Sequence, residues 1–187
     1  VLGKAADAAE VDALAETIKA AFNRKFLQPG TGRYDTATQA CQAFALYLGL
    51  TPAEERERAL SVLVRDIEDA HAGHLTTGIF GTKFMLQALT DEGRADVAFG
   101  IVNQSTFPGW GYMLEHGATT LWEHWEFSDN TFSHNHPMFG SVSEWFYRAL
   151  AGINAAPDAV GFDKIVIRPQ PVGDLKWVKA SYDSVRG

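Results

Sequence analysis

Apolar positions in the first third of the chain follow two different helical patterns. Between Val11 and Phe22 they recur every three or four residues, and acidic and basic residues occupy the other side. This spacing predicts an amphipathic helix at the surface. The segment from Thr36 to Leu48 is instead small and apolar nearly all round. Such a segment is typical of an inner helix that its neighbours cover.

The same order then repeats along the chain. Thr51-Pro52-Ala53-Glu54 combines a capping Thr, a Pro at the first helical position and a Glu at the third, which predicts the start of a helix. A compact apolar run from Phe84 to Leu89 is followed by a Gly93 stop and by an amphipathic segment ending at Val102. The alternation predicts stacked helical hairpins in which the outer helix of each pair faces water. The apolar stripe expected for the outer helix after residue 51 is Leu60, Leu63, Val64 and Ile67.

The last third mixes a helix with extended segments. The stripe from Val142 to Ile153 predicts one more helix, whereas Ile165–Ile167 and Trp177–Tyr182 predict β-strands bounded by turn residues. We therefore expect a mainly α fold, with helical hairpins over residues 1–157 and a β-type unit over residues 158–187. So few strands cannot close a sheet, so they must dock on the helices or pair with sequence outside this chain.

Composition narrows the range of partners. The formal net charge is -7 and the basic residues are scattered, which leaves no stripe for a phosphate backbone, so we expect no nucleic-acid partner. No apolar run approaches the roughly 18 residues that span a bilayer, and we expect no membrane partner. The single Cys41 excludes an intrachain disulfide and is expected to be a buried structural thiol. The cellular compartment stays unassigned.

Residues 106–137 interrupt the helical rhythm and hold the densest chemistry, with a short helical stretch expected from Thr119 to Trp125. Glu123 stands between aromatic neighbours there, and two histidines follow in a turn-like context. Indole faces stack on the apolar faces of sugars, while Glu and His side chains reach hydroxyls and move protons. The cluster therefore suggests a carbohydrate site. Its candidate members are Trp110, Trp122, Glu123, Trp125, His134 and His136.

Each candidate also has a plainer interpretation. Glu123 could lie at a helix surface or pair with a nearby His, and His134 and His136 could cap or brace a loop, contact a sugar or bind a metal. Trp110 lies between glycines, so its ring is either an exposed stacking platform or an aromatic plug over helix ends. A metal is disfavoured because no helical His-x-x-x-His pair occurs and Cys41 is distant in sequence. Serine-elbow and phosphate-loop motifs are absent, and we expect no cofactor.

Three segments carry a resemblance to a known family. They are Gly117 to Trp125 with its Thr-Thr-Leu-Trp-Glu block, Ser133 to His136 running on to Glu144-Trp145, and Gly161 to Pro169. Together they resemble the C-terminal part of a bacterial α-L-rhamnosidase. The resemblance implies a catalytic domain built as a six-hairpin α/α toroid followed by a β-sandwich. Residues 1–157 would be its later hairpins, and residues 158–187 the first strands of the sandwich.

The resemblance also implies roles for the site residues. Glu123 would be the general base of an inverting hydrolysis, and His136 would hold rhamnose hydroxyls, a role that His134 could take instead. Trp110, Trp122 and Trp125 would shape the sugar pocket. The general acid of the family comes from an acidic segment earlier in the catalytic domain, and nothing before residue 100 resembles it. The implied partners are rhamnose-containing glycosides or polysaccharides and the rest of the parent catalytic domain, without which we expect little activity.

The chain departs from the family pattern at two places, and two other functions are compatible with the same residues. The family more often has Arg where His124 stands, and its connection between the Trp-Glu pair and the Asn-His pair is usually longer, which bears on the sugar accepted. A carbohydrate-binding module without hydrolytic chemistry would use the same aromatic residues. A lyase or uronide hydrolase on a helical toroid would need Arg or Lys for the uronate, whereas the cations near the cluster are histidines.

Overall fold

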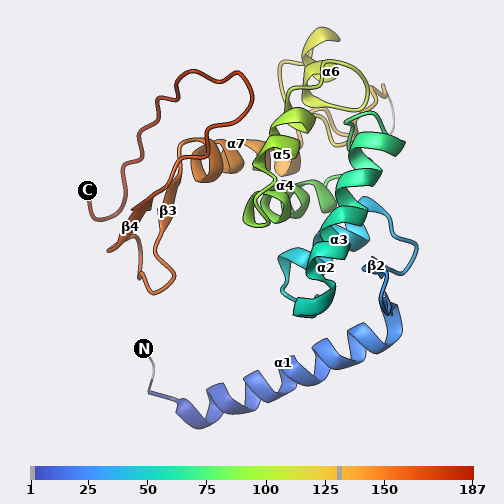
Figure 1. Cartoon of the computed structure of the whole chain (residues 1–187). Coiled ribbons are helices and arrows are strands. Elements are labelled where there is room, and N and C mark those ends of the chain that lie inside the picture. The colour runs from blue at the N-terminus through green and yellow to red at the C-terminus, as the bar shows by residue number, and fades with distance from the viewer. Residues whose placement is uncertain (1–2, 130–131) are drawn as a thin grey trace.

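The computed structural model describes residues 3–129 and 132–187, and helices form most of the ordered secondary structure (Figure 1). The antiparallel strands β1 and β2 form one small sheet, and β3 and β4 form another. The helices α3 and α7 continue into wider π-type turns, η1 and η3, and a short 3-10 turn, η2, precedes α7. In chain order the elements are α1 (Ala5–Phe26), β1 (Leu27–Gln28), β2 (Arg33–Tyr34), α2 (Gln39–Tyr47), α3 (Ala53–Arg65), η1 (Asp66–Ala70), α4 (Gly81–Asp91), α5 (Ala95–Val102), α6 (Trp110–Glu115), η2 (Pro137–Gly140), α7 (Ser141–Trp145), η3 (Phe146–Leu150), β3 (Ile153–Ala155) and β4 (Ile165–Ile167).

The helices α2 to α5 pack as two successive hairpins. The helix α2 packs against both α3 and α4, and α4 in turn contacts α5 and α7. The helices α2, α4 and α7 therefore form an inner layer, and α3 and α5 cover its outside. This arrangement is a partial α/α toroid of stacked helical hairpins followed by a short β segment, so the predicted fold class is confirmed.

Burial in the inner layer follows from the sequence pattern. The helix α2 begins where Thr38 Oγ1 accepts a hydrogen bond from the backbone N–H of Cys41, and it buries Ala43, Ala45 and Leu46. The outer helix α3 buries one face, including Leu63, and turns its charged side chains toward solvent except for Glu55, which is buried. Burial of each large aliphatic side chain contributes about 1.5–3 kcal/mol, so the stacked hairpins are held mainly by this shared apolar layer.

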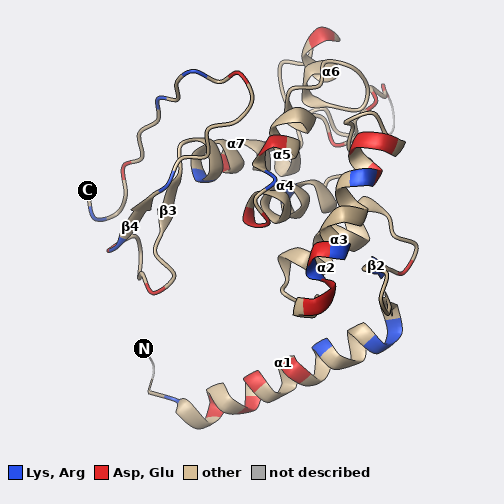
Figure 2. Cartoon of the chain, in the orientation of Figure 1, with Lys and Arg blue, Asp and Glu red and all other residues tan. Residues whose placement is uncertain are grey.

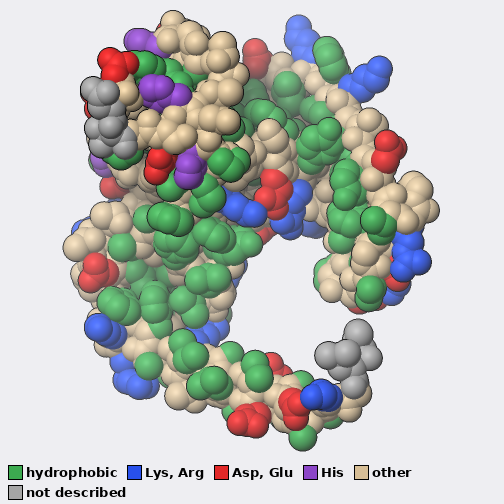
Figure 3. Space-filling model, turned by 180° about the vertical axis from the view of Figure 1, so that it is seen from behind, with side chains coloured by type: hydrophobic (Ala, Val, Ile, Leu, Met, Phe, Trp, Pro, Cys, Tyr) green, Lys and Arg blue, Asp and Glu red, His purple; other side chains and the backbone are tan. Residues whose placement is uncertain are grey.

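The helix α1 exists as predicted but lies apart from this core. Every residue of α1 is described and none is buried, and Val11, Leu14 and Ile18 are 63%, 57% and 56% exposed. Only its C-terminal end, through Phe22 and Phe26, packs against the core. Figure 3 shows the hydrophobic side chains of α1 at the surface of an arm that projects from the rest of the chain.

Three expectations about local structure were wrong. The chain around Trp122 is not helical; the helix of this region is α6, which ends before Gly117, a residue with φ +78°. The segment Trp177–Tyr182 is extended but forms no ladder with any described strand, so it has no partner for its backbone groups. Ile153 belongs to β3 rather than to a helix, because Gly152 has φ +70° and turns the chain back along Arg168.

Basic and acidic residues both occur along most of the described chain, as the colours of the ribbon in Figure 2 show. Along α1 the acidic residues come first and the basic ones last, whereas α3 mixes both signs within its first two turns. Within residues 3–129 and 132–187, none of the helices combines the length and the apolar character that crossing a bilayer requires.

Candidate active site

The two halves of the Trp-Glu and His cluster are irregular loop segments that backbone hydrogen bonds hold side by side. The backbone N–H of Glu123 donates to the carbonyl oxygen of Ser133 at 2.8 Å, and the N–H of His136 donates to the carbonyl oxygen of Leu121 at 2.8 Å. The Thr120 hydroxyl adds a bond to the carbonyl oxygen of His134. Backbone pairing thus brings together the two segments that sequence reasoning had grouped by chemistry.

The carboxylate of Glu123 is fixed by a backbone amide. Its Oε2 accepts a hydrogen bond from the N–H of Ser133 at 3.0 Å, and the side chain is half-buried. Ser133 itself is held in a tight turn, because its Oγ accepts from the N–H of Asn135 at 3.1 Å. Sequence reasoning had not identified Ser133 as part of the site. The Ser-x-Asn pattern predicts a turn at Ser133. Nothing in the sequence indicates that the backbone amide of this turn points at Glu123.

One wall of the cluster is aromatic. Trp122 is buried, and its ring meets Phe127 edge-on, with ring centroids 5.2 Å apart. The His134 imidazole stacks on the same Phe127 at 4.4 Å and an interplanar angle of 22°. Offset and edge-on contacts of this kind are the favoured arrangements of aromatic rings. His134 and Trp122 therefore share one packed surface beside Glu123.

Trp110 and Trp125 form a second, fully packed aromatic group with Phe139. Their rings meet edge-on at 5.0 Å, and Trp125 stacks on Phe139 at 3.7 Å. Each indole N–H donates to a backbone carbonyl oxygen, that of Phe139 at 3.1 Å for Trp110 and that of Thr77 at 2.7 Å for Trp125. Trp110 is only 8% exposed, so the interpretation as an exposed stacking platform is wrong. The Trp110 ring is instead a buried aromatic plug that packs against Trp125 and Phe139.

Unlike the indole nitrogens of Trp110 and Trp125, which donate hydrogen bonds, one ring nitrogen of each of the two histidines is left unbonded in the described residues. Nε2 of His134 and Nε2 of His136 are enclosed, and neither has a hydrogen-bond partner among the described residues. A buried polar atom without a partner costs free energy, so such a position favours a bound water or a ligand hydroxyl. Both atoms belong to the segment whose backbone bonds to the segment that carries Glu123.

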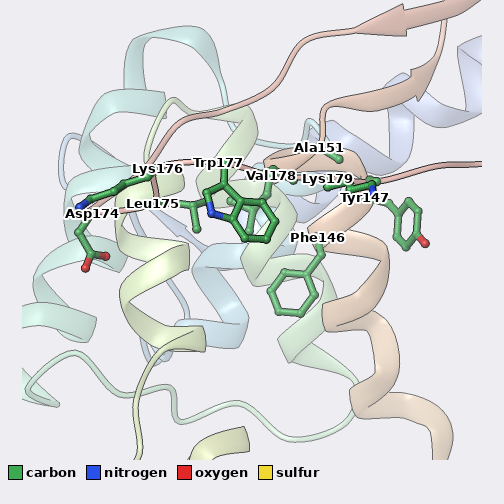
Figure 4. A pocket seen from close by; sticks show the side chains of 11 residues that line it. Phe146, Tyr147, Ala151, Asp174, Leu175, Lys176, Trp177, Val178 and Lys179 are labelled. Carbon is green, nitrogen blue, oxygen red and sulfur yellow. The ribbon is translucent and has the colours of Figure 1, made fainter.

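Cavities occur beside the cluster and, separately, near the β segment. A hollow of about 230 Å³ adjoins the cluster and is lined by Trp110, Met113 and the chain from Ala118 to Leu121. A larger hollow of about 690 Å³ lies between η3 and the extended C-terminal segment, where Phe146 and Trp177 face it (Figure 4). The larger hollow is therefore separate in the fold from the Glu123 carboxylate.

Stacked helical hairpins with a half-buried carboxylate in a connecting loop have the architecture of an α/α toroid domain, and the family comparison identifies it as a glycosidase domain. Residues 1–150 match the model of the bacterial alpha-L-rhamnosidase 6 hairpin glycosidase domain. Residues 152–187 match that of the bacterial alpha-L-rhamnosidase C-terminal domain. The chain belongs to the bacterial α-L-rhamnosidase family, which confirms the resemblance found in the sequence. The division after residue 157 stays a prediction, since β3 on one side of it pairs with β4 on the other.

Individual relatives agree with the family match. An alpha-L-rhamnosidase of Streptomyces avermitilis is 39% identical over the whole chain, and one of Formosa agariphila is 32% identical. The solved alpha-L-rhamnosidase of Dictyoglumus thermophilum superposes with a TM-score of 0.87 at 46% identity, over 92% of this chain and 20% of that one. The solved structure of the Streptomyces avermitilis alpha-L-rhamnosidase complexed with L-rhamnose superposes with a TM-score of 0.83 at 38% identity. The match covers 89% of this chain and 17% of that one. The chain spans 18% and 21% of the length of the two sequence relatives.

Proposed function

We propose that this chain is the C-terminal part of the catalytic unit of an inverting α-L-rhamnosidase, which releases terminal α-L-rhamnose from rhamnosides. Glu123 acts as the general base that activates the attacking water. The family match over residues 1–150 supports the substrate class, and a family relative has been solved with L-rhamnose bound. The carboxylate of Glu123, its hydrogen bond and its half-buried position support the role in catalysis.

The single observation that carries the assignment is the asymmetry of the Glu123 carboxylate. Oε2 is occupied by the Ser133 amide, whereas Oε1 makes no hydrogen bond to any residue in the described parts of the chain. An inverting glycosidase needs a carboxylate oxygen that can take a proton from water on the face opposite the leaving group. Oε1 is suited to this task, because the amide orients the group without consuming its second oxygen.

The histidines are the proposed contacts to the sugar. His136 Nε2, and Nε2 of His134 as the alternative, are enclosed atoms that have no hydrogen-bond partner in the part of the chain that the structure describes, and a rhamnose hydroxyl would satisfy either. Trp110, Trp122 and Trp125 shape the pocket from beneath, because their rings are buried and set the position of the loop. They support the sugar site through packing.

The proton donor is proposed to come from the rest of the parent enzyme. Inverting hydrolysis needs a second carboxyl roughly 6.5–9.5 Å from the base, which protonates the leaving oxygen. No segment before residue 100 resembles the acidic segment of the family. The 187-residue chain by itself is therefore expected to hydrolyse rhamnosides very slowly or not at all, since base and acid must act together.

Substitution in the intact parent enzyme tests the base. Glu123→Gln keeps the shape of the side chain and removes the proton acceptor, so turnover of an aryl α-L-rhamnoside should fall by about 10²–10⁴-fold. The matched control is Glu126→Gln, three positions on and exposed, which should keep turnover within about twofold of wild type. Near-normal turnover of Glu123→Gln would exclude Glu123 as the base. NMR of the first product anomer tests the inverting stereochemistry independently.

A further inference from the structure

We infer that the backbone amide of Ser133 is a positioning group that aims the Glu123 carboxylate, so that residue 133 acts on catalysis through its main chain. The inference rests on the proposed function of Glu123 and deepens it. Its basis is a reciprocal pair of bonds between two residues. The Glu123 N–H donates to the Ser133 carbonyl oxygen at 2.8 Å, and the Ser133 N–H donates to Glu123 Oε2 at 3.0 Å.

The reciprocal pair fixes more than a single bond could. The bond to the Ser133 carbonyl sets the position of the Glu123 backbone, and the bond from the Ser133 amide sets the direction of its side chain. A Glu side chain otherwise has three rotatable bonds and sweeps a wide volume. A charge-assisted bond from a backbone donor is a directional restraint that survives changes of side chain at position 133.

Ser133 can serve as a fixed reference because its surroundings hold it on both sides. The bond from His136 N–H to Leu121 continues the pairing beyond it, and Thr120 bonds the next carbonyl, that of His134. The Ser133 side chain closes its own turn through Asn135. The rings of His134 and Trp122 both pack on the partly exposed Phe127, and these contacts restrain rotation of the two paired segments.

The expected effect on the reaction is geometric. A general base must lie within hydrogen-bond reach of the water proton, and misplacement by about 1 Å can cost about 10²-fold in rate. The amide takes Oε2 and thereby leaves Oε1 as the oxygen that meets the water. Loss of the amide should therefore lower kcat, while KM, which reflects sugar contacts made by side chains rather than by this amide, changes little.

Two variants at position 133 in the intact parent enzyme separate the amide from the side chain. Ser133→Pro removes the N–H, and we expect kcat on an aryl α-L-rhamnoside to fall by about 10²-fold with KM within about twofold. Ser133→Ala keeps the N–H and loses only the contact with Asn135, so its kcat should be at least about tenfold higher than that of Ser133→Pro. Equal kcat values for the two variants, with Glu123→Gln inactive, would overturn the inference alone. Normal turnover of Glu123→Gln would instead overturn the proposed function.

A measurement on the full 187-residue chain covers the case in which Ser133→Pro fails to fold. Amide hydrogen exchange followed by NMR reports the Ser133 N–H directly, and Glu123→Ala removes its acceptor. We expect the Ser133 amide to exchange at least about tenfold faster in Glu123→Ala than in wild type. The His136 amide, bonded to Leu121, is the internal control and should change by less than about twofold. Unchanged exchange at Ser133 would show that the carboxylate does not hold the amide.

Discussion

The indole Nε1 of Trp125 donates a 2.7 Å hydrogen bond to the carbonyl oxygen of Thr77, a residue 48 positions earlier in the chain. Thr77 belongs to the loop that leads into α4, and Trp125 to the loop that carries Glu123. The bond therefore ties the loop that carries Glu123 to the inner helix layer. Since Thr77 and Trp125 are both buried, the bond is shielded from water.

Replacement of Trp125 should reveal how strongly this link holds the fold. Trp125→Phe keeps an aromatic ring on Phe139 but leaves the Thr77 carbonyl oxygen without its donor. We expect the free energy of unfolding in urea to fall by about 1–3 kcal/mol, the usual cost of an unsatisfied buried polar group. Trp177→Phe is the control, because Trp177 is 77% exposed, and its effect should stay within about 0.5 kcal/mol.

The buried carboxylate of Glu55 should be essential to the β1–β2 hairpin. Its two oxygens accept hydrogen bonds from the backbone N–H groups of Gly30 and Gly32. Glu55→Ala leaves both amides without an acceptor, so the free energy of unfolding should fall by about 2–4 kcal/mol. Glu54→Ala, at an exposed neighbouring position, should cost about 0.5 kcal/mol or less. Equal losses for the two variants would contradict the role of the buried carboxylate.

Two glycines of the same turn should respond differently to an added methyl group. Both have positive φ, +77° at Gly30 and +68° at Gly32. A Cβ at Gly32 would lie 2.5 Å from the carbonyl carbon of Arg58, whereas a Cβ at Gly30 would meet nothing within 4 Å. Gly30→Ala should therefore cost only the backbone strain, about 1–2 kcal/mol. Gly32→Ala should cost clearly more in a thermal or urea unfolding experiment.

Stability should decrease in acid partly through Glu144. Hydrogen bonding by Lys83, aided by Arg148, holds the pKa of the Glu144 carboxyl below its usual value. A lowered pKa in the folded state means that the ion pair stabilises the fold above the unfolded value of about 4.3 and is lost as pH falls through the folded value. Because Lys83 and Glu144 are 45% and 40% exposed, we expect Lys83→Met to cost only about 0.5 kcal/mol at pH 7. The difference from wild type should shrink as pH falls below the unfolded-state pKa and through the lower folded-state pKa of Glu144, and it should also shrink in high salt.

The helical hairpins were predictable because periodicity is a local property. The apolar stripe through Leu60, Leu63 and Ile67 and the start at Thr51-Pro52 placed α3 within a few residues of its observed bounds. The strand Trp177–Tyr182 was not predictable as such, because a strand is completed by its partner. Extended chain without a partner has the pattern of a strand and forms none of its ladder bonds.

The candidate site, like the fold, has features that residue types predict and features that depend on distant contacts. Residue types alone grouped Glu123 with the histidines of residues 134 and 136, and the structure places the two segments side by side. The burial of Trp110 could not be read from its flanking glycines, because it depends on Phe139, which lies 29 positions away and accepts its hydrogen bond. The Ser133 amide was missed for a related reason. A backbone donor leaves no trace in residue identity.

The arm-like helix α1 has a consequence for handling the protein in solution. The helix α1 has no buried residue and is attached to the core only near its C-terminal end, through Phe22, Asn23 and Phe26, so most of its 22 residues gain no stability from tertiary packing. A protease should therefore cut first within α1, at Lys19, Arg24 or Lys25 for trypsin, long before it reaches the hairpins. A brief digest would yield a trimmed body that begins near β1 and still contains the entire Glu123 loop.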